Sequence, residues 1–363
     1  MRAAVLEAPS QDLVVMDDVE ITKPGQREIR VRVAYCGVCH SDLHVIDGGL
    51  PGMMPTVLGH EAAGIVDAIG DAVTEVALGD KVILTLKPVC GRCYFCVRGQ
   101  PTLCATYDTL IPSSPPPLSR RGAPVFPGLG MGAFAEQVVV SVDAAVQVPD
   151  DTPLDVACVI GCAVQTGVGA VLNTARVPAG ATVLVQGLGG VGISIVQGAR
   201  LVGAAQILAV DPFAERRALV TQFGATATID PGEEDVAAAA MYLTGGVGVD
   251  YAFDAVGNAG LVGVGVAACR PGGTTVCVGV PRMDENIDIP ALFFAMGEKK
   301  LTGCFLGSSN PHLEFPRLLQ LWRAGRLDLE GMVTARRPLE QINEAFADMR
   351  AGHGIRTVLE IDA

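Results

Sequence analysis

Four cysteines in the first third of the chain lie close enough in sequence to hold one metal ion. They follow the spacing C-x2-C-x2-C-x7-C, with Gly91 between the first two, and are Cys90, Cys93, Cys96 and Cys104. Thiolate sulfurs suit a tetrahedral zinc ion, and four of them leave no coordination position for a substrate. The chain has eleven cysteines, an odd number, and no secretion signal is recognisable, so a disulfide framework is the weaker interpretation. The pattern predicts a structural zinc site.

Three other fragments contain residues that could bind a second, catalytic zinc. Cys39 lies in the run CGVCHSD at 36–42, His60 precedes Glu61, and Cys162 begins the run CAVQTG at 162–167. Catalytic zinc needs three protein ligands and an open position. Each fragment alone is a weak signal, because a lone cysteine is most often a small buried hydrophobic residue.

A glycine-rich turn predicts a dinucleotide site. The apolar segment 181–186 leads into Gly187-Leu188-Gly189-Gly190-Val191-Gly192, which matches G-x-G-x-x-G, and a helical pattern follows over 191–201. Between a buried strand and a helix, these glycines allow a tight turn, close approach of a pyrophosphate and close packing of the helix. The pyrophosphate would then meet the N-terminus of the helix.

An acidic residue after the next strand bears on the choice of dinucleotide. The strand 206–210 ends at Asp211, nineteen residues after Gly192. A carboxylate there would bond the adenosine ribose hydroxyls and repel a 2′-phosphate, which favours NAD over NADP. Arg216 and Arg217 follow closely and complicate this interpretation.

The elements that must position these residues divide the chain in two. The chain has 363 residues, half of them apolar, with 44 glycines and few aromatic residues, which suits a two-domain α/β protein. The first 150 residues are strand-rich, with predicted strands at 28–33, 63–68 and 81–86. Beyond residue 155 helical patterns alternate with buried strands, an arrangement typical of a parallel sheet; these strands are 181–186, 206–210, 251–255 and 274–279. Further helices are predicted over 316–324 and 339–351.

Other features limit the possible partners. The Pro- and Gly-rich segment 107–132 predicts a long surface loop without regular structure. The net charge of −13 argues against nucleic acid and against an anionic membrane surface. The longest apolar stretches are broken by glycines and charges, so no transmembrane helix is expected, and the cytosol is the expected location.

Taken together, the fragments around Cys39, His60 and Cys162 resemble the medium-chain, zinc-containing alcohol dehydrogenase family, over essentially the whole chain. The resemblance implies a strand-rich GroES-like catalytic domain over 1–163 and 306–363, with a structural zinc lobe at about 88–106. A Rossmann domain with a doubly wound parallel sheet would occupy 164–305 and bind NAD. Two zinc ions per chain are implied, one of them in the four-cysteine site.

The resemblance also implies roles for individual residues. Cys39, His60 and Cys162 would be the catalytic zinc ligands, and Glu61 the nearby carboxylate that can transiently replace one of them. Asp42 would accept a hydrogen bond from the His60 imidazole and fix its tautomer. Ser41 and His44 resemble a hydroxyl-and-imidazole proton relay. Cys36 matches no ligand and is expected to pack in the core.

Contacts with cofactor and substrate are implied in the same way. His40 and Arg356 would contact the pyrophosphate, and Arg216 would lie beside the adenosine ribose. Thr166 and Val280 would flank the nicotinamide. The substrate pocket would be lined by Leu50, Leu86 and Val280. Because some relatives carry an aromatic ring where Leu86 stands, the pocket is expected to admit a medium-sized or aromatic alcohol.

The expected reaction is hydride transfer between an alcohol, primary by preference, and NAD, which yields an aldehyde or ketone. One alternative is oxidation of a thiol–formaldehyde adduct; the counterpart of the cation that such relatives use falls at Asp108, and Arg120 and Arg121 could serve instead. A nicotinamide that stays bound is a second alternative. A non-catalytic, dinucleotide-binding zinc protein is a third, and it would hold one zinc rather than two. A homodimer paired through 301–305 is expected, with a homotetramer as second choice.

Overall fold

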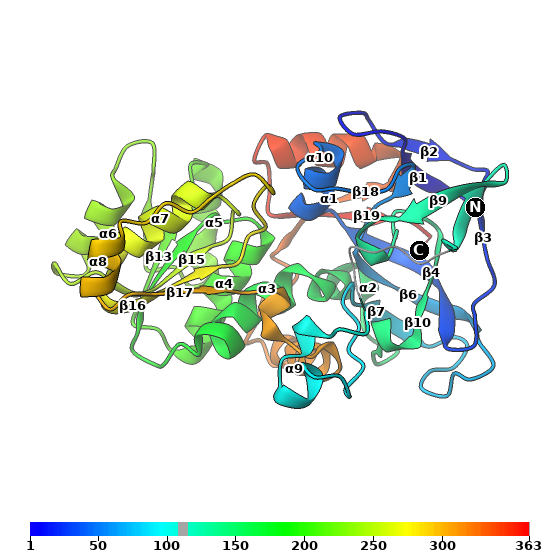
Figure 1. Ribbon diagram of the computed structural model, residues 1–363, viewed down its shortest axis with the longest axis horizontal. Coiled ribbons are helices and arrows are strands. Elements are labelled where there is room, and N and C mark those ends of the chain that lie inside the picture. The colour runs from blue at the N-terminus through cyan, green and yellow to red at the C-terminus, as the bar shows by residue number, and fades with distance from the viewer. Residues whose placement is uncertain (108–114, 363) are drawn as a thin grey trace. The chain divides into compact units, whose positions relative to one another are not determined.

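A computed structural model describes residues 1–107 and 115–362 (Figure 1). The chain folds into two compact units. The first unit comprises Met1–Cys162, Asn310–Gln320 and Leu329–Ala363. The second comprises Ala163–Ser309 and Leu321–Asp328. The short segment Leu321–Asp328 therefore belongs to the second unit, although the resemblance implies that all of 306–363 belongs to the catalytic domain.

The first unit contains two sheets. One has the order β2-β1-β5-β9-β8-β3 and is formed by β1 (Ala3–Leu6), β2 (Val14–Met16), β3 (Val19–Ile21), β5 (Thr56–Val57), β8 (Leu118–Arg120) and β9 (Ala123–Pro127). The other has the order β11-β7-β6-β4-β19-β18, with β10 paired to β4. Its strands are β4 (Glu28–Gly37), β6 (Glu61–Ile69), β7 (Lys81–Leu84), β10 (Gln137–Ser141), β11 (Ala145–Gln147), β18 (Val333–Pro338) and β19 (Arg356–Glu360).

Short helical segments connect these strands. The α-helices of this unit are α1 (His40–Ile46), α2 (Leu154–Ala157), α9 (Pro311–Arg323), whose last turn falls in the second unit, and α10 (Ile342–Arg350). The 3-10 turns are η1 (Cys96–Arg98), η2 (Pro101–Leu103), η3 (Gly128–Gly130), η4 (Val142–Ala144), η5 (Cys158–Gly161) and η8 (Leu339–Gln341).

Strand β4 organises the second of these sheets. Ile29, Val31 and Val33 alternate inward along it and are fully buried, as the period of two in a half-buried strand requires. Its last residue, Gly37, pairs with Glu61, the first residue of the antiparallel strand β6. The residues that leave β4 and those that enter β6 therefore meet at one edge of the sheet.

The second unit is built on a parallel sheet with the order β14-β13-β12-β15-β16-β17. Its strands are β12 (Thr182–Gln186), β13 (Gln206–Val210), β14 (Ala227–Ile229), β15 (Val249–Asp254), β16 (Cys269–Cys277) and β17 (Lys300–Gly303). The order reverses direction between β12 and β15, which is the switch point of a doubly wound sheet. The predicted fold class is confirmed.

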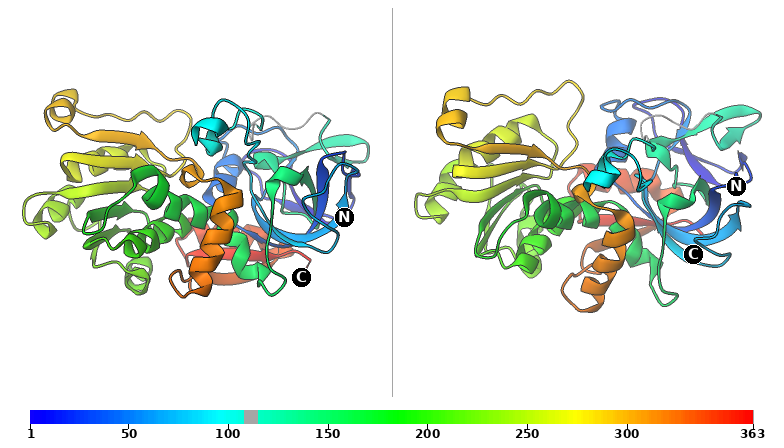
Figure 2. Two further views of the ribbon diagram at one scale, coloured as in Figure 1. Left: turned by 90° about the horizontal axis from the view of Figure 1, so that it is seen from below. Right: turned by 60° about the horizontal axis from the view of Figure 1, so that its bottom comes forward.

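Helices cover this sheet on both faces, as Figures 1 and 2 show. The helical segments of this unit are α3 (Ala163–Gly169), α4 (Gly190–Val202), α5 (Ala214–Phe223), α6 (Val236–Leu243), α7 (Ala259–Ala268) and the short α8 (Ala291–Met296), with the π-helical turn η6 (Ala170–Ala175) and the 3-10 turn η7 (Leu306–Ser308). Right-handed crossovers between parallel strands require this arrangement.

One expectation about local structure is wrong. The segment 107–132, expected to be a loop, contains the hairpin β8–β9 within its described part. Leu118 and Val125 pair across the hairpin and are buried, and the turn between the strands has positive φ at both Arg121 and Gly122. That backbone is typical of a type I′ hairpin turn, which the prolines around it obscured. Asp108 lies outside the described residues.

A second expectation misplaces a helix start. The helix expected from Pro316 begins at Pro311, with Pro316 inside it. The Asn310 side chain accepts a hydrogen bond from the His312 N–H (3.2 Å), and Pro311 occupies the first helical position. Asn followed by Pro is a helix-start signal, and of the two prolines the earlier one marks the start.

Candidate active site and zinc sites

Three predicted zinc ligands come together in the first unit. Cys39 follows β4, His60 immediately precedes β6, and Cys162 follows η5. The two sulfurs and one imidazole nitrogen all lie within 4.8 Å of one another, and all three residues are buried. Residues 21 and 102 positions apart thus form one cluster, because β4 ends where the antiparallel strand β6 begins and η5 returns to the same place.

The donor set fits a cation. His60 Nε2 is buried and makes no hydrogen bond within the described residues. An unsatisfied ring nitrogen in a buried site is costly unless a ligand completes it. Two thiols and an imidazole are zinc ligands, and three protein ligands leave one position open, as in catalytic zinc sites.

Asp42 orients the imidazole. Its Oδ1 atom lies 3.1 Å from His60 Nδ1 and accepts a hydrogen bond from the Gly59 N–H at 2.9 Å, and its side chain is fully buried. With Nδ1 donating to a carboxylate, Nε2 carries the lone pair that faces the two sulfurs. The sequence-based expectation of an Asp42 acceptor agrees with this geometry.

A buried ion pair lies beside the cluster. Arg356 Nη2 lies 3.3 Å from Glu61 Oε1, and Arg356 Nη1 donates to the Val38 carbonyl at 2.8 Å. The arginine therefore contacts the residue before Cys39 and the residue after His60. Gly37 leaves room for the carboxylate, because a Cβ atom there would lie 2.1 Å from Glu61 Oε2. The predicted contact of Arg356 with a pyrophosphate stays a prediction.

Electrostatics favour negative charge on the first ligand. A hydrogen bond from Cys162 lowers the pKa of Cys39 well below its usual value; burial opposes this, and the nearby His60 and Arg356 reinforce it. The pKa of Arg356 is raised despite its burial, because Glu61 and the Cys39 sulfur face it. A thiolate facing an imidazole in a buried site is an arrangement that a divalent cation can stabilise.

The remaining predicted residues of this unit lie on or near α1. Ser41 Oγ lies 3.9 Å from Cys39 Sγ, and His44 is half-buried three residues further along the helix, on the same face. His40 is exposed at the start of α1. Leu50 and Leu86 are half-buried and pack against the hydrophobic core. Cys36 is part of that core, as expected.

The four-cysteine cluster is a second candidate zinc site. The sulfurs of Cys90, Cys93, Cys96 and Cys104 lie within 4.8 Å of one another. Gly91 has a φ of +70°, which lets the chain turn sharply between the first two ligands. The Thr106 hydroxyl and the Arg92 N–H lower the pKa of Cys90 to about 6. Four sulfurs without another donor fit a structural zinc ion.

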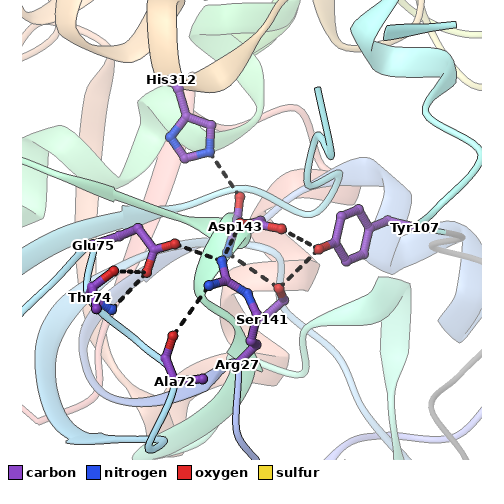
Figure 3. Close-up of polar contacts among 8 residues, drawn as sticks. All are labelled: Arg27, Ala72, Thr74, Glu75, Tyr107, Ser141, Asp143 and His312. Carbon is purple, nitrogen blue, oxygen red and sulfur yellow. Dashed lines mark hydrogen bonds and ion pairs between the residues drawn. The ribbon is translucent and has the colours of Figure 1, made fainter. Parts of the chain in front are cut away.

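Polar contacts close the neck of this lobe. Lys87 Nζ, three residues before Cys90, donates to the carbonyl of Tyr107, three residues after Cys104. Figure 3 shows the Tyr107 ring directed at Asp143 and Ser141; its hydroxyl donates to the Asp143 carboxylate and lies 3.3 Å from Ser141 Oγ. Ser141 is the last residue of β10 and Asp143 lies in η4, so the Tyr107 side chain contacts both segments. The lobe is therefore fastened to the first unit at its base.

Asp143 also connects this neck to other segments of the first unit. Asp143 Oδ1 pairs with Arg27 Nη2 (3.3 Å), which also pairs with Glu75 (2.7 Å), and the Asp143 carbonyl lies 3.1 Å from His312 Nε2 on α9 (Figure 3). Segments far apart in sequence are thus linked through Asp143, by its carboxylate and by its main-chain carbonyl.

The glycine-rich turn of the second unit has the geometry that a pyrophosphate site needs. Gly187 has a φ of +88°, and a Cβ atom on Gly192 would lie 1.8 Å from the Gly187 carbonyl. A Cβ atom on Gly189 would meet nothing within 4 Å, so open space faces the start of α4. Gly190, Val191 and Gly192 form the first turn of this helix, where free N–H groups can face an anion.

Asp211 lies beside the glycine-rich turn, to which its carboxylate is hydrogen-bonded. It is buried at the end of β13, and its carboxylate accepts hydrogen bonds from the N–H groups of Leu188 (2.8 Å) and Phe213 (2.9 Å). Arg216 Nη1 lies 3.9 Å from the same carboxylate. Thr166 on α3 is buried, with no hydrogen bond to its hydroxyl among the described residues, and Val280 is exposed after β16.

Family models match both units. The zinc-binding dehydrogenase model matches residues 190–324, and the alcohol dehydrogenase GroES-like domain matches residues 25–150. The S-(hydroxymethyl)glutathione dehydrogenase of Saccharomyces cerevisiae is 35% identical over 96% of this chain and 93% of its own length. The chain belongs to the medium-chain, zinc-containing alcohol dehydrogenase family.

Solved structures agree with this membership. The alcohol dehydrogenase zinc-binding domain protein from Burkholderia ambifaria has a TM-score of 0.94 and 34% identity, covering 100% of this chain and 99% of that one. Benzyl alcohol dehydrogenase from Acinetobacter calcoaceticus has a TM-score of 0.93 and 31% identity, covering 99% of both chains. The chain is thus an oxidoreductase of the alcohol dehydrogenase type.

The contacts of this dehydrogenase also include pairings that the sequence did not predict. The Glu61–Arg356 pair joins positions 295 apart, and the neck contact between Lys87 and Tyr107 joins two residues without a shared motif. No local sequence pattern predicts either pair. Within the described residues no single helix is long and apolar enough to cross a membrane; one bent pair, 154–161 with 163–175, passes that test only jointly.

Proposed function

We propose that this dehydrogenase oxidises an alcohol to an aldehyde or ketone with NAD as hydride acceptor, using one catalytic and one structural zinc ion. The observation that carries the proposal is the buried His60 Nε2, which faces two sulfurs and makes no hydrogen bond within the described residues. A zinc ion bound by Cys39, His60 and Cys162 would act as a Lewis acid that makes an alcohol hydroxyl easier to deprotonate. Cys90, Cys93, Cys96 and Cys104 would hold the structural ion.

The chain's own residues supply the remaining functions. Asp42 holds the His60 ring, and Arg356 holds Glu61 beside the ligands. Ser41 and His44 share one face of α1 next to Cys39, where a hydroxyl and an imidazole can pass a proton away from a buried site. Glu61 is the carboxylate that could replace a ligand.

The second unit would bind the cofactor. The pyrophosphate would lie against Gly187, Gly189 and the start of α4. Asp211 would bond the adenosine ribose hydroxyls beside Arg216 and disfavour a 2′-phosphate, so NAD is the proposed cofactor. Thr166 and Val280 would flank the nicotinamide.

The proposed substrate is a medium-sized or aromatic primary alcohol. Leu50 and Leu86 are half-buried apolar residues of the first unit, and a leucine at position 86 occupies less space than an aromatic ring. The relative from Acinetobacter calcoaceticus is a benzyl alcohol dehydrogenase.

A thiol–formaldehyde adduct is a second candidate, since one relative is an S-(hydroxymethyl)glutathione dehydrogenase. The two arginines available to hold the carboxylates of such a thiol already have a partner: Arg120 Nε lies 2.6 Å and Arg121 Nε lies 3.0 Å from the Asp18 carboxylate. A carboxylate between two guanidiniums offsets part of their charge, which favours the plain alcohol.

The edge of the parallel sheet is the proposed dimer contact. Strand β17 pairs with β16 on one side and has no strand partner on the other among the described residues. The adjacent α8 exposes Leu292, Phe293 and Met296. An unpaired edge next to exposed apolar side chains is suited to pairing with a second copy by a two-fold axis.

The test is NADH formation across a panel of short, medium-chain, cyclic and aromatic alcohols, together with zinc content. Wild type should turn over with NAD and hold two zinc ions per chain; Cys39→Ala should hold one and be inactive. Cys36→Ala is the matched control, a buried cysteine three residues away that is outside the ligand cluster. Turnover with formaldehyde plus a thiol alone would favour the second candidate, and one zinc in wild type without turnover would favour a non-catalytic protein.

A further inference from the structure

Arg217 lies next to Asp211, and its positive charge is already engaged within the second unit. Its Nη1 atom donates to the Asp211 main-chain carbonyl at 2.6 Å, and its Nη2 atom lies 2.5 Å from Asp230 Oδ2. The side chains of Arg217 and Asp230 are 17% and 22% exposed. The guanidinium is therefore close to the proposed adenosine site but held by a carboxylate.

Asp230 is itself well fixed. It follows β14, and β14 pairs with β13 so that Ile229 lies opposite Val210. Asp230 and Asp211 thus leave neighbouring parallel strands at the same level. Asp230 Oδ1 accepts a hydrogen bond from the Gly232 N–H (2.9 Å), and its carbonyl accepts from Glu233 (3.1 Å) and Glu234 (3.0 Å). One oxygen holds the turn and the other holds Arg217.

The neighbouring arginine is less able to move. Arg216 is buried, its guanidinium lies over the Phe213 ring at 5.2 Å, and its Nη1 atom lies 3.9 Å from the Asp211 carboxylate. Arginine is well suited to bind a phosphate, because its planar fork can donate two hydrogen bonds. Of these two arginines, Arg217 is the one that could turn to a 2′-phosphate if its carboxylate partner were absent.

We propose that Asp230 is a specificity-determining residue for NAD over NADP, because its pairing with Arg217 withholds that guanidinium from a 2′-phosphate. The inference rests on the proposed cofactor site. Asp211 repels the 2′-phosphate directly, and Asp230 prevents the nearby cation from offsetting this repulsion. Neither carboxylate acts on the nicotinamide end of the cofactor.

The test measures binding of two cofactor fragments to the full chain by isothermal titration calorimetry, without turnover. The fragments are 5′-AMP, which has a free 2′-hydroxyl, and 2′,5′-ADP, which carries the 2′-phosphate. Asp230→Asn should bind 2′,5′-ADP about tenfold more tightly than wild type, on the order of one charge-assisted hydrogen bond. Its affinity for 5′-AMP should stay within about twofold, since the ribose contact at Asp211 is untouched.

The controls separate this role from general effects. Glu234→Gln removes the same charge from an exposed residue of the same loop and should change neither affinity. Adding Arg217→Gln to Asp230→Asn should abolish the tenfold gain. Asp230→Ser carries the same expectation, should the Asn variant fail to fold.

Three outcomes would overturn the inference. They are equal 2′,5′-ADP affinities in Asp230→Asn and Glu234→Gln, a gain that survives Arg217→Gln, and an equal loss of affinity for both fragments, which would show a purely structural role. If wild type bound neither fragment, the proposed cofactor site itself would be wrong, and the role of Asp230 would be wrong with it.

Discussion

At the scale of single residues, the proposed zinc ligands are held in place by side chains outside the ligand set. The carboxylate of Asp42 is buried and bonds both His60 Nδ1 and the Gly59 N–H. It therefore fixes the imidazole and the backbone beside it. Such supporting carboxylates raise the basicity of the ligand and hold its orientation.

Replacing Asp42 should loosen one zinc ion selectively. Asp42→Asn keeps the shape but removes the charge, and its affinity for the catalytic zinc should fall by about 10–100-fold. Competition with a chromogenic chelator would measure this, with the structural zinc as an internal reference. Asp71→Asn, at an exposed turn, should bind both ions as wild type does. Loss of both ions in Asp42→Asn would contradict the assignment.

Asp250 carries a pH-dependent contribution to the second unit. Its carboxylate accepts from Thr182 N (2.8 Å), Thr182 Oγ1 (2.9 Å) and Arg270 Nε (2.7 Å). Burial would raise the pKa of Asp250, but these hydrogen bonds lower it below its ordinary value. A depressed carboxyl pKa stabilises the fold above the ordinary value near 3.8, and this contribution disappears as the pH falls through the folded value.

Replacing Asp250 should make the free energy of unfolding less dependent on pH. Asp250→Asn should be less stable than wild type by about 1–3 kcal/mol at neutral pH. The difference should stay constant down to about pH 5 and narrow at about pH 3.5. Urea unfolding at these pH values would measure it, with the exposed Asp284→Asn as control. If the difference in free energy of unfolding widened as the pH fell, the pKa of Asp250 would not be lowered in the folded state.

At the scale of elements, the zinc lobe differs from the sheets around it. Between Cys90 and Tyr107 only Thr102 and Cys104 are buried, so this segment has no hydrophobic core of its own. Its order must come from the four sulfurs and from the neck contacts of Lys87 and Tyr107. Small segments without a core commonly depend on a structural metal.

Removing one of these sulfurs should therefore unfold the lobe and leave the rest of the unit intact. Cys93→Ser should hold one zinc per chain instead of two, and limited proteolysis should cut within 90–106. The cleavage pattern of Cys277→Ser, a cysteine outside both clusters, should match wild type. An uncut lobe in the zinc-depleted variant would show that the neck suffices without the metal.

At the scale of the whole molecule, the exposed face of α8 beside the sheet edge sets the expected assembly. Phe293 is 73% exposed and lies with Leu292 and Met296 on α8, the helix that directly precedes the edge strand β17 in sequence. Aromatic side chains of this kind are commonly the main energetic contributors to an interface.

A charge at this position should weaken the dimer. Phe293→Asp should raise the dimer dissociation constant at least about 30-fold, or about 2 kcal/mol. Sedimentation velocity across a concentration series would measure it. Tyr242→Asp changes another exposed aromatic residue, on α6, and should leave the dimer unchanged. A monomeric wild type, or equal effects of the two substitutions, would refute the proposed contact.

The sequence by itself determined the features that are local along the chain. The four-cysteine spacing, the glycine-rich turn between a strand and a helix, and the alternating pattern of β4 each depend on residues a few positions apart. Such features are set by backbone geometry and by side-chain periodicity, which act over short distances. Strands β12, β13, β15 and β16 of the parallel sheet were accordingly predicted near their observed bounds, whereas the short β14 was not predicted and the hairpin β8–β9 was hidden by the prolines around it.

Only the tertiary structure decided which distant residues meet. The fold of the first unit brings Cys39, His60 and Cys162 together, and it places Arg356 in an ion pair with Glu61. It also places Asp230 on Arg217, at the ends of neighbouring strands. No local pattern encodes these contacts, because register and strand order follow from packing of the whole unit. The polar pairs form there because buried charges and donors need partners, whatever their distance in sequence.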